Sequence, residues 1–198
     1  MLALYVIRHG ETEWALTGQH TGSTDVPLTV HGEAEARELR ASLAGIDFSA
    51  VLVSPRQRAR RTCELAGLDS QAVVEAGLVE WNYGSYEGRR TVDIRRDRPD
   101  WNIFLDGCPR GELPAEIAAR TDRLIDHLCA LGGNVALFTH GQFGCVLAAR
   151  WIGLPVVEAQ HLTFGPASRS ILSYSPSHPD VRVIELWNAP PNLRLSSV

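Results

Sequence analysis

The sequence predicts a single α/β domain over residues 1–198, a three-layer sandwich in which a mostly parallel central sheet carries helices on both faces. Short apolar runs alternate with longer stretches of helical character along the chain. The 198 residues, 44% of them hydrophobic, are enough to bury one sizeable core. Neither an internal repeat nor a linker divides the chain into two parts.

Two strands and two helices are expected in the first third of the chain. Residues 3–7 and 50–53 are continuous apolar runs of the kind that form buried strands. Residues 33–44 and 56–66 have the composition of helices. A glycine directly follows each of these two stretches, and glycine is a common residue at the end of a helix.

The same alternation continues in the rest of the chain. Residues 114–131 place apolar side chains at helical spacing and precede two glycines, which predicts a long amphipathic helix. A third buried strand is expected at 135–138, and a helix at 142–152. Two late strands are expected at 170–174 and 181–187, separated by a turn that contains Pro, Ser and His.

Residues 8–29 and 76–113 fall largely outside these elements and are long, polar and rich in glycine. Loops of this length are uncommon in a compact domain unless they build a site. In open α/β sheets the ligand crevice lies beyond the carboxyl ends of the strands. The sequence therefore places its candidate site at that edge of the sheet.

Composition and charge exclude several classes of protein. The formal net charge of −4 argues against a nucleic-acid partner, because proteins that bind nucleic acids are usually basic. No apolar run approaches the roughly 18 residues of a membrane helix, and the opening apolar run is too short for a signal peptide. The four cysteines are scattered without a C-x-x-C pair, which predicts free thiols in a cytoplasmic protein.

The chain contains no lysine, since all 19 of its basic residues are arginines. The simplest explanation for the missing lysines is a biased base composition of the genome. Whatever its origin, the absence excludes Schiff-base catalysis by a lysine and a phosphate-binding loop of the Walker type.

Two predicted strands each run directly into a histidine–glycine pair. Residues 8–10 read Arg-His-Gly and residues 139–141 read Thr-His-Gly. Parallel strands carry their carboxyl ends at the same edge, so His9 and His140 are expected to lie close together. A lone histidine is more often structural than catalytic, but two in the same context favour a catalytic role.

Two further segments carry chemistry. Residues 54–62 start a helix just after a strand, which points first-turn amides and arginines at the crevice and suits an anion. In the segment 80–88, Glu80 stands beside Trp81, where desolvation would raise the pKa of the carboxyl and suit a general acid. For the segment 54–62 the simpler interpretation is a solvated helix face, which we expect for Arg56, Arg60 and Arg61. For Glu80 the simpler interpretation is an ordinary loop glutamate.

Taken in chain order, these four segments resemble the histidine phosphatase superfamily, whose best-known branch is the cofactor-dependent phosphoglycerate mutases. The resemblance spans most of residues 3–152. It implies that His9 is the nucleophile that becomes phosphorylated, and that Arg8, Arg58 and His140 surround the phosphoryl group. It makes Glu80 the proton donor. It implies no metal and no cofactor, and a small phosphate ester as the ligand.

The resemblance also implies substrate contacts outside the catalytic set. The segment 18–29 matches a second family motif. Together with the two arginines, the implied contacts are Thr21, Gly22, Tyr83, Gly141 and Gln142. The other histidines lack any motif context and are expected to be surface or structural residues: His20, His31, His127, His161 and His178.

Two departures argue against a mutase. Ala15 stands where the mutases carry asparagine, and Thr91 falls where they carry a lysine, without their inserted arginines. The segment 101–112 instead resembles the sedoheptulose-bisphosphatase-like branch and small bacterial acid phosphatases. One or two of the nearby arginines are candidates for holding a second substrate phosphate: Arg89, Arg90, Arg95, Arg96 and Arg98.

The sequence thus predicts a metal-independent phosphomonoesterase that hydrolyses small phosphorylated metabolites, sugar phosphates or bisphosphates, through a phosphohistidine. A cofactor-dependent phosphoglycerate mutase and an inactive sugar-phosphate-binding module are the alternatives. A homo-oligomer is compatible with the sequence, and no membrane partner is expected.

Overall fold

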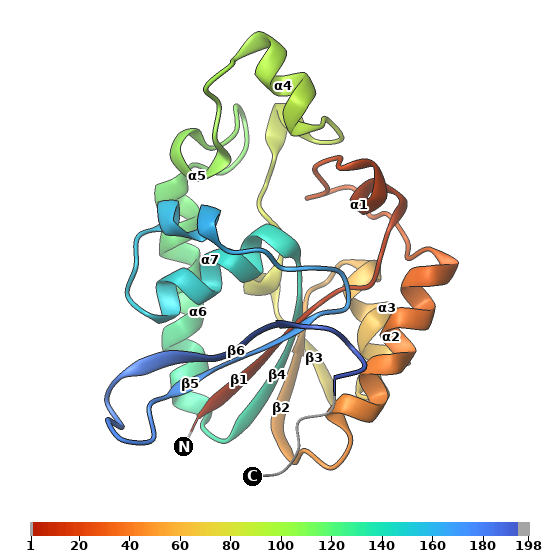
Figure 1. Cartoon of the computed structure of the whole chain (residues 1–198), viewed down its shortest axis with the longest axis vertical. Helices are drawn as coiled ribbons and strands as arrows, with labels where there is room; N and C mark the ends of the chain where they lie inside the picture. The colour runs from red at the N-terminus through yellow and green to blue at the C-terminus, as the bar shows by residue number, and fades with distance from the viewer. Residues whose placement is uncertain (1, 194–198) are drawn as a thin grey trace.

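The computed structural model describes residues 2–193 and is organised around one six-stranded sheet of order β3-β2-β4-β1-β5-β6. β1 to β4 run parallel to one another, while β5 pairs antiparallel with β1 and β6 antiparallel with β5 (Figure 1). The strands are β1 Ala3–Arg8, β2 Phe48–Val53, β3 Ala72–Val74, β4 Asn134–Thr139, β5 Arg169–Tyr174 and β6 Arg182–Ala189.

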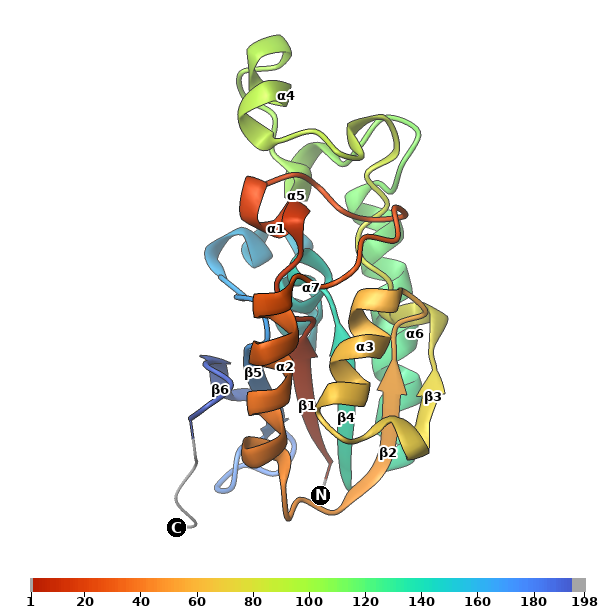
Figure 2. The same ribbon diagram turned by 90° about the vertical axis from the view of Figure 1, so that its right-hand side faces the viewer.

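Helices cover both faces of the sheet, with α2 and α3 on one face and α6 and α7 on the other (Figure 2). This arrangement confirms the predicted three-layer α/β sandwich. The α-helices are α1 Glu13–Thr17, α2 Val30–Leu43, α3 Gln57–Leu65, α4 Thr91–Asp97, α5 Ile103–Asp106, α6 Pro114–Leu131 and α7 Gly141–Trp151. Short 3₁₀ turns occur at Asp69–Gln71, Ala76–Leu78, Gly84–Tyr86 and Val156–His161.

The central strands β1 and β4 contribute buried side chains to the cores on both faces of the sheet, which explains their continuous apolar sequences. Leu4 and Val6 of β1 pack in the core formed with α6 and α7, whereas Ile7 packs in the core formed with α2 and α3. All three side chains are fully buried. Burying one such side chain contributes about 1.5–3 kcal/mol, so the two cores together hold the layers in place. Within residues 2–193, no helix is both long and apolar enough to cross a membrane.

The predicted helices and strands all form, with shifted ends in several cases. α2 begins at Val30, three residues before the predicted start at 33, because the Thr29 hydroxyl caps it by accepting a hydrogen bond from the Gly32 amide at 2.9 Å. The elements without a sequence prediction are all short, namely β3, α1, α4 and α5. Their lengths of three to seven residues are too small to show a periodicity.

Strand register determines what meets at the carboxyl edge of the sheet. β1 pairs Arg8 with Thr139 of β4, and β2 pairs Val53 with Phe138 of the same strand. The residues that follow these strand ends are therefore neighbours. The segments that leave this edge, including α1 and α4, lie beyond the sheet on the same side of the molecule (Figure 1).

Candidate active site

The two motif histidines meet at this edge, as the sequence predicts. The ring centroids of His9 and His140 lie 5.2 Å apart, with 63° between the ring planes. Both rings are buried, and His9 keeps 5% of its surface exposed. β1 and β4 thus bring two imidazoles from distant parts of the chain into contact.

Hydrogen bonding fixes the tautomer of His9. Its Nδ1 lies 2.7 Å from the carbonyl oxygen of Gly10, which can only accept, so Nδ1 carries the proton and Nε2 keeps its lone pair. Burial, followed by the charges of Arg8 and Arg58, holds the pKa of His9 well below its usual range. A neutral imidazole with a free Nε2 lone pair near pH 7 can act as a nucleophile.

Gly10 is required by a close backbone crossing. A Cβ at this position would overlap the carbonyl oxygen of Gly32 at the start of α2. The Gly10 amide donates a hydrogen bond of 3.0 Å to the hydroxyl of Thr62 on α3. Both helices on this face therefore clamp the loop that orients the His9 ring.

His140 uses both of its ring nitrogens in hydrogen bonds to protein groups. Its Nδ1 accepts from the Nε–H of Arg58 at 3.2 Å, which leaves the proton on Nε2 for donation to the Ser54 hydroxyl at 2.7 Å. Burial and the charge of Arg58 hold the pKa of His140 well below its usual range. In this arrangement the neutral ring of His140 positions Arg58.

Arg58 is fully buried and holds the loop before α2. Its Nη1 donates to the carbonyl of Thr24 at 3.0 Å, and its Nη2 donates to the carbonyls of Thr21 at 3.0 Å and Gly22 at 3.2 Å. Burial lowers the pKa of the guanidinium from its ordinary value. Arg58 therefore places one positive charge at the site in a fixed orientation.

Arg8 lines the cavity next to His9 and has a free donor. Its Nη1 donates to the carbonyl of Phe164, while its Nε is buried and has no hydrogen-bond partner within residues 2–193. A Cβ on Gly141 would lie 3.2 Å from the Arg8 Cζ, so the glycine lets the guanidinium pack against the start of α7. A buried donor without a partner is costly, and an anionic ligand would satisfy it.

Glu80 is buried at the first turn of α7, with 7% of its surface exposed. Its Oε1 accepts from the amides of Trp81 at 2.9 Å and Phe143 at 2.7 Å, and its Oε2 accepts from the amide of Gln142 at 3.0 Å. Burial raises the pKa of the carboxyl, and the three amides and Arg58 oppose that rise without cancelling it. A raised pKa suits a group that must hold a proton.

A cavity of about 390 Å³ adjoins these side chains. It is lined by Arg8, His9 and Glu80, and by four of the residues expected to contact substrate: Thr21, Tyr83, Gly141 and Gln142. Gly22 is placed differently. Its amide donates to the Glu87 carboxylate at 2.9 Å, and a Cβ there would lie 2.5 Å from the carbonyl oxygen of Trp81, so Gly22 shapes the loop from behind the cavity.

His20 departs from the expectation of a surface or structural histidine, because it lines the cavity. Its ring stacks on Tyr83 with centroids 4.5 Å apart, and its Nε2 lies 3.2 Å from the hydroxyl of Thr91. Burial lowers the pKa of His20 to about 4. The position of His20 within the motif at 18–29 was the one available sequence signal. The other four histidines without motif context are exposed.

Other lining residues had no sequence signal. Leu162, Thr163 and Phe164 come from the loop before β5, and Cys145 comes from α7. They reach the cavity only through tertiary packing, since no motif surrounds them.

None of the five arginines at 89–98 lines this cavity. Each is bound to an acidic side chain or a carbonyl near α4, which corrects the expectation that one or two of them hold a second phosphate. Arg89 binds Asp97 and the Asp93 carbonyl, Arg90 and Arg96 bind Asp93, Arg95 binds the Trp101 carbonyl, and Arg98 binds Asp106.

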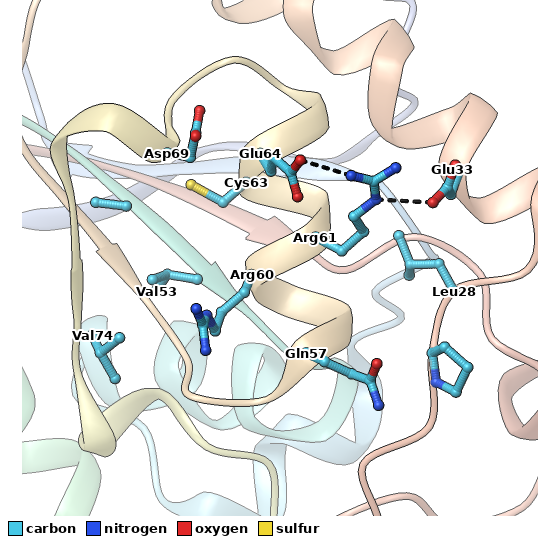
Figure 3. A pocket seen from close by; sticks show the side chains of 12 residues that line it. Leu28, Glu33, Val53, Gln57, Arg60, Arg61, Cys63, Glu64, Asp69 and Val74 are labelled. Carbon is cyan, nitrogen blue, oxygen red and sulfur yellow. Dashed lines mark hydrogen bonds and ion pairs between the residues drawn. The ribbon is translucent and has the colours of Figure 1, made fainter.

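A larger cavity of about 620 Å³ lies beside α3 and contains none of the predicted site residues (Figure 3). Arg61 lies on its wall and forms ion pairs with Glu33 at 2.9 Å and Glu64 at 2.7 Å. Arg61 is 38% exposed, and Arg60 is exposed as well, so both belong to the expected solvated helix face. The predicted catalytic residues Arg8, His9 and Glu80 line the smaller cavity instead. Within residues 2–193, no three or more His, Cys, Asp or Glu side chains cluster as a metal site would require.

The chain resembles known proteins over most of its length. The model of the histidine phosphatase superfamily, branch 1, matches residues 4–188. The acid phosphatase of Mycobacterium tuberculosis is 37% identical over 194 residues, covering 94% of each chain. The sedoheptulose 1,7-bisphosphatase of Saccharomyces cerevisiae is 34% identical over 183 residues, covering 76% of this chain and 68% of that protein.

The solved structure of an open reading frame product from Mycobacterium tuberculosis matches with a TM-score of 0.87 at 34% identity, covering 96% of this chain and 98% of the other. Sequence and structure thus agree over nearly the whole chain. We conclude that the chain is a phosphatase that belongs to branch 1 of the histidine phosphatase superfamily.

Proposed function

We propose that the protein is a metal-independent phosphomonoesterase that hydrolyses small phosphorylated metabolites through a phosphohistidine at His9. One observation carries the proposal: the neutral His9 ring lines the same cavity as Arg8, whose buried Nε–H has no partner. A nucleophile and an unsatisfied cationic donor together suit a phosphoryl group. The name of the yeast relative supports phosphorylated sugars as the substrate class.

In the first step, the Nε2 lone pair of His9 attacks phosphorus as the bond from phosphorus to the alcohol oxygen breaks. The Nδ1 proton stays on the ring, held by the Gly10 carbonyl at 2.7 Å. Arg8 and Arg58 offset the charge on the phosphoryl oxygens. Glu80 donates its proton to the departing alcohol oxygen, so the alcohol leaves neutral.

In the second step, water attacks the phosphohistidine, and the Glu80 carboxylate takes a proton from that water. The bond between phosphorus and Nε2 breaks, which releases inorganic phosphate and restores the lone pair of His9. Three backbone amides hold Glu80 in place through both steps. The same carboxyl thus serves as acid and then as base.

p-Nitrophenyl phosphate should be hydrolysed without any added cation, and EDTA should leave the rate unchanged. The charges that the transfer needs are supplied by two guanidinium groups and protein hydrogen bonds. The release of nitrophenolate measures the rate. A large loss in EDTA that a divalent ion restores would contradict metal independence. No turnover at all would favour the inactive binding module.

Hydrolysis should outrun transfer between the hydroxyls of phosphoglycerate. A mutase must protect its phosphohistidine from water and hold the carboxylate of the acceptor, but Ala15 offers no polar contact on the cavity wall. Phosphorus NMR of the enzyme with 3-phosphoglycerate and catalytic 2,3-bisphosphoglycerate tests this. Efficient formation of 2-phosphoglycerate with little free phosphate would restore the mutase alternative.

A cytoplasmic location stays a prediction from the sequence.

A further inference from the structure

The cavity beside His9 carries little positive charge. Among its described lining residues Arg8 is the one arginine, and the chain has no lysine. His20 also lines the cavity, but its pKa of about 4 leaves the ring neutral near pH 7. Arg58 is buried behind the cavity, where carbonyl groups and His140 occupy its donors. The available positive charge is therefore committed to the phosphoryl group itself.

The arginine-rich segment does not supply a second anion site. Arg89 lies 2.7 Å from the Asp97 carboxylate, and Arg90 lies 2.7 Å from that of Asp93. Thr91, the first residue of α4, is the residue of 89–98 that lines the cavity wall. The segment therefore presents the neutral hydroxyl of Thr91 to the cavity, while its arginines are bound to carboxylates near α4 or, for Arg95, to the Trp101 carbonyl.

The rest of the wall is neutral and partly aromatic. The stacked rings of His20 and Tyr83 both line the cavity, and Trp101 packs edge-on against His20 with centroids 5.6 Å apart. The polar side chains of Gln142 and Thr163 also line the cavity. Rings and uncharged polar groups suit a polyhydroxylated or cyclic alcohol.

We propose that the site selects phosphate monoesters whose alcohol portion is uncharged, and that it discriminates against a second phosphate or a carboxylate on that alcohol. This inference rests on the phosphatase activity proposed above. A second anion would lose its hydration without gaining a counter-charge from the cavity wall. A neutral sugar or polyol would pack against the His20–Tyr83 stack and hydrogen-bond with the wall.

Matched substrates test the proposal. Glycerol 3-phosphate and 3-phosphoglycerate differ by a hydroxymethyl group in place of a carboxylate, and fructose 6-phosphate and fructose 1,6-bisphosphate differ by one phosphate. We expect kcat/KM to be about tenfold or more higher for the less charged member of each pair. Equal values, or a preference for the charged members, would overturn the proposal.

A cation added on the cavity wall should reduce the difference in kcat/KM between the paired substrates. Ala15→Arg places a guanidinium on the cavity wall, whereas Leu16→Arg adds the same charge at the next residue of α1, which is 59% exposed and does not line the cavity. We expect the ratio between paired substrates to shrink at least threefold in Ala15→Arg and to stay at its starting value in Leu16→Arg. A ratio that changes equally in both variants would refute a local charge effect.

Failure of this inference is distinguishable from failure of the proposed function. If p-nitrophenyl phosphate and glycerol 3-phosphate are turned over but the charged partners react equally well, the selectivity is wrong and the phosphatase stands. If none of these esters is hydrolysed and no phosphoenzyme forms, the proposed function itself fails, and the inference that rests on it fails with it.

Discussion

His9→Ala should abolish turnover, with a loss of about 10⁴-fold or more, the scale on which other enzymes lose rate without their nucleophile. Brief acid-free quenching of the wild-type protein with ³²P-labelled substrate should trap a label that is stable to alkali and labile to acid, as phosphorus bound to imidazole is. The variant should carry none. The reason is geometric, because His9 is the cavity-lining imidazole whose Nε2 is left free by its hydrogen bond to Gly10.

The matched control for this experiment is His127→Ala, which removes an exposed imidazole on α6. It should label and turn over as the wild type does. More than a trace of activity in His9→Ala, with the fold intact by circular dichroism, would show that the nucleophile lies elsewhere. His20 is the next candidate in that case, since it also lines the cavity.

Glu80→Gln should lower the rate on alkyl phosphates about 10²–10⁴-fold, the usual contribution of a positioned proton donor. The loss should be much smaller on p-nitrophenyl phosphate, whose leaving group hardly needs a proton. Initial rates on both substrates measure the difference. An equal loss on both would mean that Glu80 mainly holds the start of α7, where it accepts hydrogen bonds from Gln142 and Phe143.

The pH profile gives a second measurement of the same role. The pKa of Glu80 is raised, so the carboxyl keeps its proton to a higher pH than an exposed glutamate would, and the rate on alkyl phosphates should fall as pH rises through that pKa. The pKa of His9 is lowered, so the acid limb should begin only well below pH 6.5. Glu80→Gln should lose the alkaline limb, while Glu38→Gln, an exposed control on α2, should keep it.

Local pattern was enough to predict the layers and the centre of the site. Continuous apolar runs mark strands that are buried on both faces, and glycines mark where the helices end. His9 and His140 could be paired without coordinates, because each follows a parallel strand and such strands end at one edge of the sheet. Short elements such as β3 and α4 were not predicted, since three to seven residues show no periodicity.

The sequence by itself determined the fold class, the pair of candidate catalytic histidines and the exclusion of lysine chemistry, because these depend on residue type and on neighbours along the chain. The role of His9 as nucleophile came from the family resemblance. The tertiary structure decided the tautomer of His9, the burial of Glu80 and the direction in which each arginine points. Arg58 and Arg89 were both candidates for binding a phosphate group, yet one is buried against His140 and the other pairs with Asp97 near α4. Hydrogen bonds and charges act over a few ångströms between residues far apart in the chain, and their partners are set only when the layers pack.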